Sequence, residues 1–177
     1  MPTPEPIELR QADFITIDTI GPPGQRTFYL QAAQDDLLVT LIIEKEHAAA
    51  LSVAVSGLLE QLGGIEDEPE PASMDLIHPV EPLFRVGKLG LGYDQDLDLL
   101  VVVAEEAATE ETPEPARVHI WASRAHMAAL AHKAAVAVAS GRPTCILCGE
   151  TLEPDKQHVC TRGNGRKHVF EGDEDKA

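Results

Sequence analysis

Alternation of apolar and polar residues predicts three strands in the first third of the chain. Residues 14–20 read Phe-Ile-Thr-Ile-Asp-Thr-Ile, and a period of two is typical of a strand with one buried face. Two more strands are predicted at 26–32 and 37–43, after a Gly-Pro-Pro-Gly turn and a short Gln-Asp-Asp turn. The segment 37–43 is almost entirely apolar, which favours a central position in its sheet. Residues 1–12 are rich in proline, and we expect a flexible N-terminus there.

The pattern then changes to the period of an α-helix over residues 44–62. One face of this helix would carry an apolar stripe that includes Ala48, Leu51, Val55, Leu58, Leu59 and Leu62. Gly63 and Gly64 end the helix, because glycine readily adopts the left-handed conformation that terminates helices.

A similar series follows an acidic, proline-bearing linker at residues 65–82. Strands are predicted at 83–93, 97–104 and 116–121, and a second helix at 124–140 with Ser123 as its N-cap. The first of these strands contains Gly87, Gly90 and Gly92 in a sequence that superficially resembles a phosphate loop. It lacks the Gly-Lys-Ser/Thr ending and a following helix, so we expect the glycines to permit a bulge or close packing.

Strand-strand-strand-helix therefore occurs twice, over residues 13–64 and 83–141. The two helices also begin alike, with Glu-His-Ala-Ala-Ala-Leu in the first and Ala-His-Met-Ala-Ala-Leu in the second, which places His47 and His126 in register. We expect an α+β fold in which two duplicated βββα units are related by a pseudo-two-fold axis. About six mainly antiparallel strands and two packed helices would then share one core, because a single unit is too small to bury enough apolar surface.

All three cysteines lie in a short C-terminal segment that is rich in glycine and proline. Cys145, Cys148, His158 and Cys160 form the pattern C-x2-C-x9-H-x-C. Three thiolates and one imidazole can fill the tetrahedral coordination of a structural Zn2+ ion. Gly149 suits the turn of a zinc knuckle. We expect a small zinc knuckle or ribbon over residues 142–170, followed by an acidic tail at 171–177.

Other interpretations of this segment remain open. His168 is an alternative fourth ligand, although the short spacing of His158 and Cys160 suits a compact hairpin better. Iron could replace zinc, or the cysteines could be unrelated buried thiols. Disulfides fit poorly, because the number of cysteines is odd and no secretory leader precedes them.

The net charge of −16 restricts the classes of partner. It opposes nonspecific binding to nucleic acids, whose affinity comes mainly from neutralised phosphates. A basic cluster of Arg162, Arg166 and Lys167 nevertheless lies beside the zinc pattern and is a candidate partner contact. The N-terminus does not read as a secretory leader and no apolar run is long enough for a membrane span, so we expect a cytoplasmic protein.

Several blocks of sequence are linked along the chain: Gly-Gln-Arg-Thr-Phe-Tyr-Leu-Gln at 24–31, Glu-Lys at 44–45, Phe-Arg-Val-Gly at 84–87, and the C-terminal series from Gly141 to Gly165 that contains the cysteines. Together they resemble a bacterial family known as domain of unknown function 3090. Ile146 and Thr161 stand where that family has proline, and Arg166 stands where it has an aromatic residue. The resemblance covers nearly the whole chain and implies no established activity.

These features favour a non-enzymatic, zinc-binding adaptor or regulatory protein that binds a protein partner. An alternative is a nucleic-acid-binding protein that uses the zinc module and its basic flank. A third hypothesis is an enzyme with a site between the two repeats, in which His47 and His126 act as acid and base. The chain contains no Ser-His-Asp order, no H-E-x-x-H and no nucleophile elbow, so we assign no catalytic residues.

Overall fold

The computed structural model describes residues 3–22, 24–65, 70–140, 145, 147–148, 150, 158–160, 162 and 167–168. The chain divides into two compact units, Met1–Ala139 and Ser140–Ala177. The first unit contains the large sheet and both helices, and the second contains the cysteines. No helix in the described part of the chain is long and apolar enough to cross a membrane.

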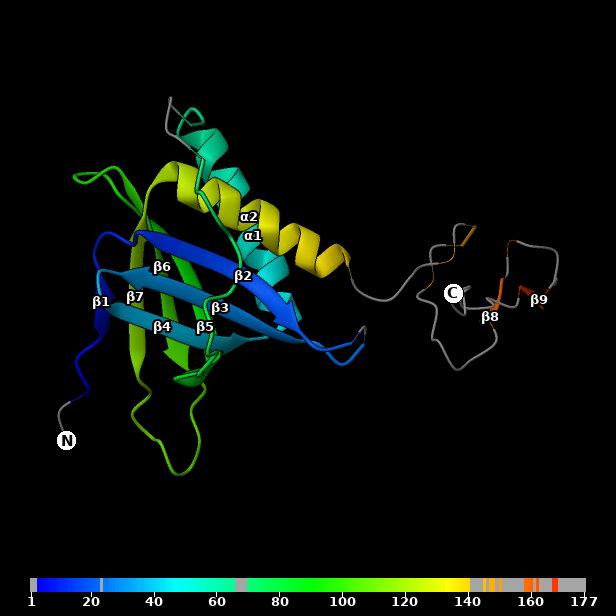
Figure 1. The fold of residues 1–177 in the computed structure, drawn as a ribbon, viewed down its shortest axis with the longest axis horizontal. Coiled ribbons are helices and arrows are strands. Elements are labelled where there is room, and N and C mark those ends of the chain that lie inside the picture. Colours follow the sequence, from blue (N-terminus) through cyan, green and yellow to red (C-terminus); the bar gives the residue numbers. More distant parts are fainter. Residues whose placement is uncertain are drawn as a thin grey trace. The chain divides into compact units, whose positions relative to one another are not determined.

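Seven strands of the first unit form one sheet in the order β1-β7-β6-β5-β4-β3-β2 (Figure 1). They are β1 (Ile7–Leu9), β2 (Phe14–Ile20), β3 (Thr27–Gln34), β4 (Leu37–Ile43), β5 (Phe84–Asp94), β6 (Leu99–Glu106) and β7 (Arg117–Ala122). Neighbouring strands are antiparallel except for the β4–β5 and β1–β7 pairs. Helix α1 (Lys45–Gln61) follows β4 and helix α2 (Arg124–Ala139) follows β7. The predicted α+β class, with a mainly antiparallel sheet and two helices, is confirmed.

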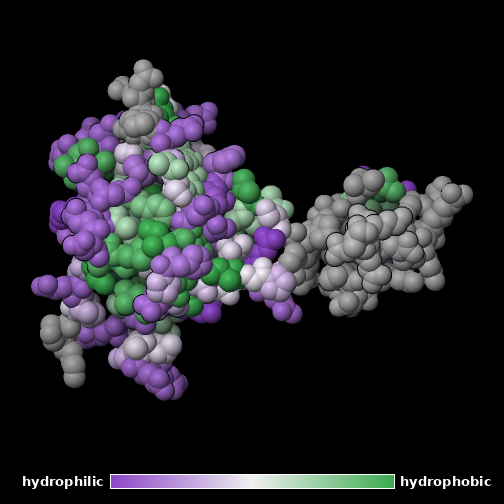
Figure 2. Space-filling model, in the orientation of Figure 1, coloured by the Kyte–Doolittle hydropathy of each residue, from purple (hydrophilic) through white to green (hydrophobic). Residues whose placement is uncertain are grey.

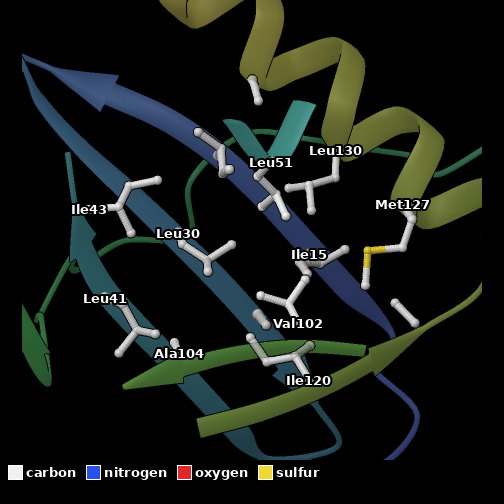
Figure 3. Packing of buried hydrophobic residues seen from close by; sticks show 14 of the residues in the cluster. Ile15, Leu30, Leu41, Ile43, Leu51, Val102, Ala104, Ile120, Met127 and Leu130 are labelled. Atoms are coloured by element: carbon white, nitrogen blue, oxygen red, sulfur yellow. The ribbon is translucent and has the colours of Figure 1, made fainter. Parts of the chain in front are cut away.

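The sheet curves around one apolar core. Side chains of β2, β3 and β4 point toward side chains of β6 and β7, and both helices add to the same cluster (Figure 3). The fully buried members include Ile15, Leu30, Leu41, Val102, Ile120, Met127 and Leu130. Burying such side chains contributes roughly 1.5–3 kcal/mol each, and this burial is the main force that holds the unit together.

The two edge strands of the sheet are consecutive in the chain. β1 and β2 are separated only by residues 10–13. The Ala12 N–H donates to the Trp121 carbonyl of β7 at 2.8 Å, and the Asp13 N–H donates to the Ala33 carbonyl of β3 at 2.9 Å. This short connection therefore hydrogen-bonds to β7, next to one edge strand, and to β3, next to the other. The two edges of the sheet lie close together because the sheet is curved.

The expectation of a flexible N-terminus over residues 1–12 does not hold for Ile7–Leu9. These residues pair in parallel with β7, opposite Val118–Ile120, and Leu9 is buried. A strand of three residues is too short to show a period of two, and its partner lies far away in the sequence.

The two helices begin in similar ways and pack against one another. At the start of α1 the Glu44 N–H donates to His47 Nδ1 at 3.1 Å, and at the start of α2 the His126 N–H donates to Ser123 Oγ at 3.2 Å. The helices are also joined where Ser52 Oγ donates to the Ala131 carbonyl at 2.8 Å. The order β2-β3-β4-α1 is repeated as β5-β6-β7-α2. Order alone does not establish a duplication, which stays a prediction.

Part of the predicted linker crosses the outer face of β2, β3 and β4. We call residues 70–83 the covering segment; in Figure 1 it runs in front of these strands on its way to β5. Apolar residues are also visible on this face of the unit (Figure 2). Within the covering segment, Ile77 is 41% exposed and Leu83 is 53% exposed. None of residues 70–83 belongs to a helix or strand, so the segment covers the sheet as irregular chain.

The contacts of the covering segment converge on a buried polar row. Thr16, Gln31 and Thr40 lie opposite one another on β2, β3 and β4, and all three are buried. Thr16 Oγ1 donates to the Met74 carbonyl at 2.6 Å. The Gln31 side-chain amide donates to the Ile77 carbonyl at 3.0 Å and accepts from the Ile77 N–H at 2.7 Å. It also donates to Thr40 Oγ1 at 3.0 Å, so the hydrogen-bonding capacity of this buried row is used.

Gly87 permits the irregularity expected in β5. The register against β6 shifts between Val86 and Lys88, on either side of this glycine. A Cβ atom at Gly87 would lie 2.7 Å from the Ala107 Cα, so the close approach of the two backbones requires glycine.

Arg124 joins the end of α1 to the β5–β6 turn. Its Nη1 donates to the carbonyls of Leu62 and Gly64 at 2.9 and 3.0 Å, and its Nη2 donates to Asp98 Oδ1 at 2.8 Å. Asp98 also accepts from the Tyr93 hydroxyl at 2.7 Å. The hydrogen bonds from Tyr93 and Arg124 hold the pKa of Asp98 below its ordinary value of 3.8.

Candidate metal centre

The candidate ligands come from two short segments of the second unit. Cys145 and Cys148 lie in a turn in which the Cys145 N–H donates to the Glu150 carbonyl at 2.8 Å. His158 begins strand β8 (His158–Val159), which pairs antiparallel with β9 (Lys167–His168). Val159 is 54% exposed, whereas Cys160 after it is fully buried. Alternation along an extended backbone therefore turns His158 and Cys160 to one side and Val159 to the other.

The four side chains meet in one cluster. The ligand atoms of Cys145, Cys148, His158 and Cys160 all lie within 4.8 Å of one another, and Cys148 Sγ is 3.2 Å from His158 Nε2. Bonds of about 2.3 Å to sulfur and about 2.0 Å to nitrogen place tetrahedral ligand atoms roughly 3.5–3.8 Å apart. The cluster therefore has the size and the donor types of a four-coordinate metal site.

The turn also prepares one thiol for ionisation. The backbone N–H groups of Cys148 and Leu147 point at the Cys145 sulfur and lower the pKa of Cys145 to about 6. For Cys148, the Glu150 N–H lowers the pKa, but burial and the neighbouring thiols Cys145 and Cys160 outweigh it and the net shift is upward. Metal ligation needs thiolates, so a turn that stabilises a negative sulfur at Cys145 favours ligation.

The structure brings together all four residues of the C-x2-C-x9-H-x-C pattern. Arg162 is exposed two residues after Cys160. The backbone of His168 lies opposite His158. The side chains of His168 and Lys167, together with Arg166 and Gly149, lie outside the part of the chain that the structure describes.

His47 and His126, the acid and base of the enzyme hypothesis, have separate surroundings. His47 Nδ1 accepts from the Glu44 N–H within the start of α1. His126 lies at the start of α2, where its Nδ1 is 2.8 Å from Ser123 Oγ and its Nε2 is 3.2 Å from the Asp13 carbonyl. These contacts are typical of residues that stabilise helix termini.

Sequence reasoning missed Glu150. Its carboxylate oxygen Oε2 is 3.8 Å from His158 Nδ1, on the side of the imidazole opposite the nitrogen that faces the cluster. An acidic residue two positions after Cys148 was the only signal in the sequence. Acidic residues are frequent in this chain, so the pattern did not distinguish it.

Comparison with known families adds one result. The model of a family described as "Protein of unknown function (DUF3090)" matches residues 7–160. This range contains β1 to β7, both helices and the four clustered residues, and it ends at Cys160. Comparisons with curated proteins and with solved structures find no match.

Proposed function

We propose that this chain, which belongs to the DUF3090 family of proteins of unknown function, is a zinc-stabilised adaptor that binds a protein partner. The observation that carries the proposal is the set of four protein donors, Cys145, Cys148, His158 and Cys160, within 4.8 Å of one another. Four protein ligands complete a tetrahedral zinc site and leave no position for water or substrate, which is typical of a structural metal.

The role of the metal in this proposal is to hold the turn at 145–150 against β8. When bound, structural zinc supplies folding free energy directly, because the site does not exist in the unfolded chain. Three thiolates also match the preference of zinc for sulfur and nitrogen donors over the oxygen donors that calcium and magnesium select.

Metal content and one ligand substitution test the zinc site. Protein without an affinity tag should contain about one zinc ion per chain by plasma mass spectrometry, as expected for a closed site. Cys145→Ser should lose the metal and the hydrogen-exchange protection of residues 158–160, while Val159→Ala, an exposed neighbour of two ligands, should retain both. Iron in place of zinc, or full zinc content in Cys145→Ser, would contradict the proposal.

Exposed apolar residues beside the ligands support a protein partner. Leu147 is 44% exposed in the turn, and Val159 is 54% exposed in β8. In the proposal these two side chains form the apolar part of the contact surface, because the buried centre of a protein–protein interface is more apolar than the rest of the surface. The net charge of −16 points the same way, because it repels polyanions.

Quantitative affinity capture with matched variants tests the partner. A true partner should bind the full chain and be lost from both Cys145→Ser and the double variant Leu147→Ser/Val159→Ser. It should be retained by Val53→Ser, which changes an apolar residue that is 74% exposed on α1. If every captured protein is retained by the double variant, the zinc module is not the contact surface.

A nucleic-acid partner is the second candidate, because Arg162 is exposed and its positive charge could contact phosphate groups. A filter-binding titration with single-stranded and double-stranded oligonucleotides separates the two candidates. Nucleic-acid binding requires an affinity that falls steeply with salt concentration and weakens in Arg162→Ala. The protein-adaptor proposal expects no measurable affinity at physiological salt.

A further inference from the structure

We infer that Glu150 is a positioning residue for the metal centre, whose carboxylate holds His158 in the tautomer that presents Nε2 to the metal. The inference rests on the proposed zinc site and assigns a role to a residue that is not itself a ligand. Its basis is the juxtaposition of Glu150 Oε2 and His158 Nδ1 at 3.8 Å.

The two nitrogens of His158 face different groups. Nε2 is 3.2 Å from Cys148 Sγ and so lies in the cluster, whereas Nδ1 faces the Glu150 carboxylate. A neutral imidazole carries one proton, so Nε2 can bind a metal only when that proton is on Nδ1. A carboxylate next to Nδ1 accepts this proton in a hydrogen bond, selects the required tautomer and makes Nε2 a stronger donor.

The environment of the pair allows this contact to form. The His158 side chain is 13% exposed, so its neighbours hold the ring, while the Glu150 side chain is 65% exposed and free to rotate. The separation of 3.8 Å is about 1 Å longer than a hydrogen bond. The inference requires the exposed carboxylate to rotate so that this separation shortens by about 1 Å.

The backbone of Glu150 serves the same centre. Its carbonyl accepts from the Cys145 N–H at 2.8 Å, and its N–H points at the Cys148 sulfur. One residue thus contacts three of the four ligand residues. A side-chain substitution leaves the two backbone contacts in place, so it isolates the contribution of the carboxylate.

The test compares Glu150→Ala, Glu150→Gln and Glu60→Ala in the full chain. Zinc affinity is measured by competition with a chromophoric chelator. Glu150→Ala should lower it about 10- to 100-fold, as loss of an outer partner of a ligating histidine does. Glu150→Gln should lower it less, because the amide oxygen still accepts from Nδ1–H. Glu60→Ala removes the same charge from an exposed position at the end of α1 and should leave affinity unchanged.

A spectroscopic signature separates positioning from a general structural effect. In the zinc-loaded protein, the 15N resonance of His158 Nδ1 should shift in Glu150→Ala, where its acceptor is lost, and should stay in place in Glu60→Ala. Unchanged affinity in Glu150→Ala, or lowered affinity with an unchanged Nδ1 resonance, would overturn the inference and leave the zinc site standing. Absence of zinc from the wild-type protein would instead overturn the zinc site, and the inference with it.

Discussion

Replacing Gln31 by leucine should destabilise the first unit by releasing the covering segment. Gln31 is fully buried on β3, and its side-chain amide makes two hydrogen bonds to the backbone of Ile77 and one to Thr40 Oγ1. Leucine has a similar volume, so the substitution removes the three hydrogen bonds without opening a large cavity.

The expected magnitude follows from these contacts. Three hydrogen bonds at about 1 kcal/mol each contribute roughly 3 kcal/mol. Leucine returns roughly 1 kcal/mol, because it does not require burial of a polar amide. We therefore expect a loss of about 2 kcal/mol in the free energy of unfolding, which is a large fraction of the roughly 5–15 kcal/mol typical of a domain.

Urea denaturation provides the assay. Trp121, the single tryptophan of the chain, lies in β7 of the first unit and reports its unfolding by fluorescence. With a denaturant dependence of about 2 kcal/mol per molar urea, the midpoint should fall by about 1 M. Cleavage before Asp75 by an aspartate-specific endoproteinase should also become faster, because Asp75 lies between Met74 and Ile77, the two residues that bond to the sheet.

Gln61→Leu is the matched control, because Gln61 is exposed at the last residue of α1. It should change the free energy of unfolding by no more than the roughly 0.5 kcal/mol usual for surface substitutions, so the midpoint should move little. If Gln31→Leu shifts the midpoint no further than Gln61→Leu, the hydrogen bonds of the buried amide do not hold the segment in place, and the reasoning fails.

Two further predictions concern the core and the acid stability of the first unit. Leu130 is a fully buried residue of α2, so Leu130→Ala should cost about 3–4 kcal/mol in the same urea assay, whereas Val53→Ala at an exposed position should cost far less. The hydrogen bonds from Tyr93 and Arg124 lower the pKa of Asp98 below 3.8, so the stabilisation they give is present above that pH and is lost as the pH falls through the folded-state pKa. Asp98→Asn should therefore make the thermal midpoint fall less steeply between pH 5 and pH 2 than in the wild type; identical slopes would contradict this account.

Local patterns were sufficient for most regular elements of the first unit. The predicted strands 14–20 and 37–43 agree with β2 and β4 at both ends, and the second helix begins at residue 124 as expected. These elements have long, clear periods because one face of each packs into the shared core. Gly63 and Gly64 also end α1 as predicted, with φ values of 90° and 89°.

The residues of the candidate metal centre were likewise identified from spacing alone. Each of the four needs only to lie in a turn or short strand that its near neighbours define, so local sequence carries the information. Glu150 was not identified, because its relation to His158 depends on how the turn meets β8. A carboxylate has no spacing rule comparable to that of the cysteines.

Other features were decided only by tertiary structure. The sequence determined the helices, six of the seven strands of the main sheet and the four clustered donors, because each is encoded by a short-range pattern. It did not show that β1 joins the sheet, since a three-residue strand is ordered by a partner distant in the chain. It also did not indicate that Gln31, on the face of β3 opposite the apolar core, is buried. The covering segment buries this face, and its position is visible only in the fold. The segment has no regular pattern of apolar residues, so its sequence does not indicate which strands it covers.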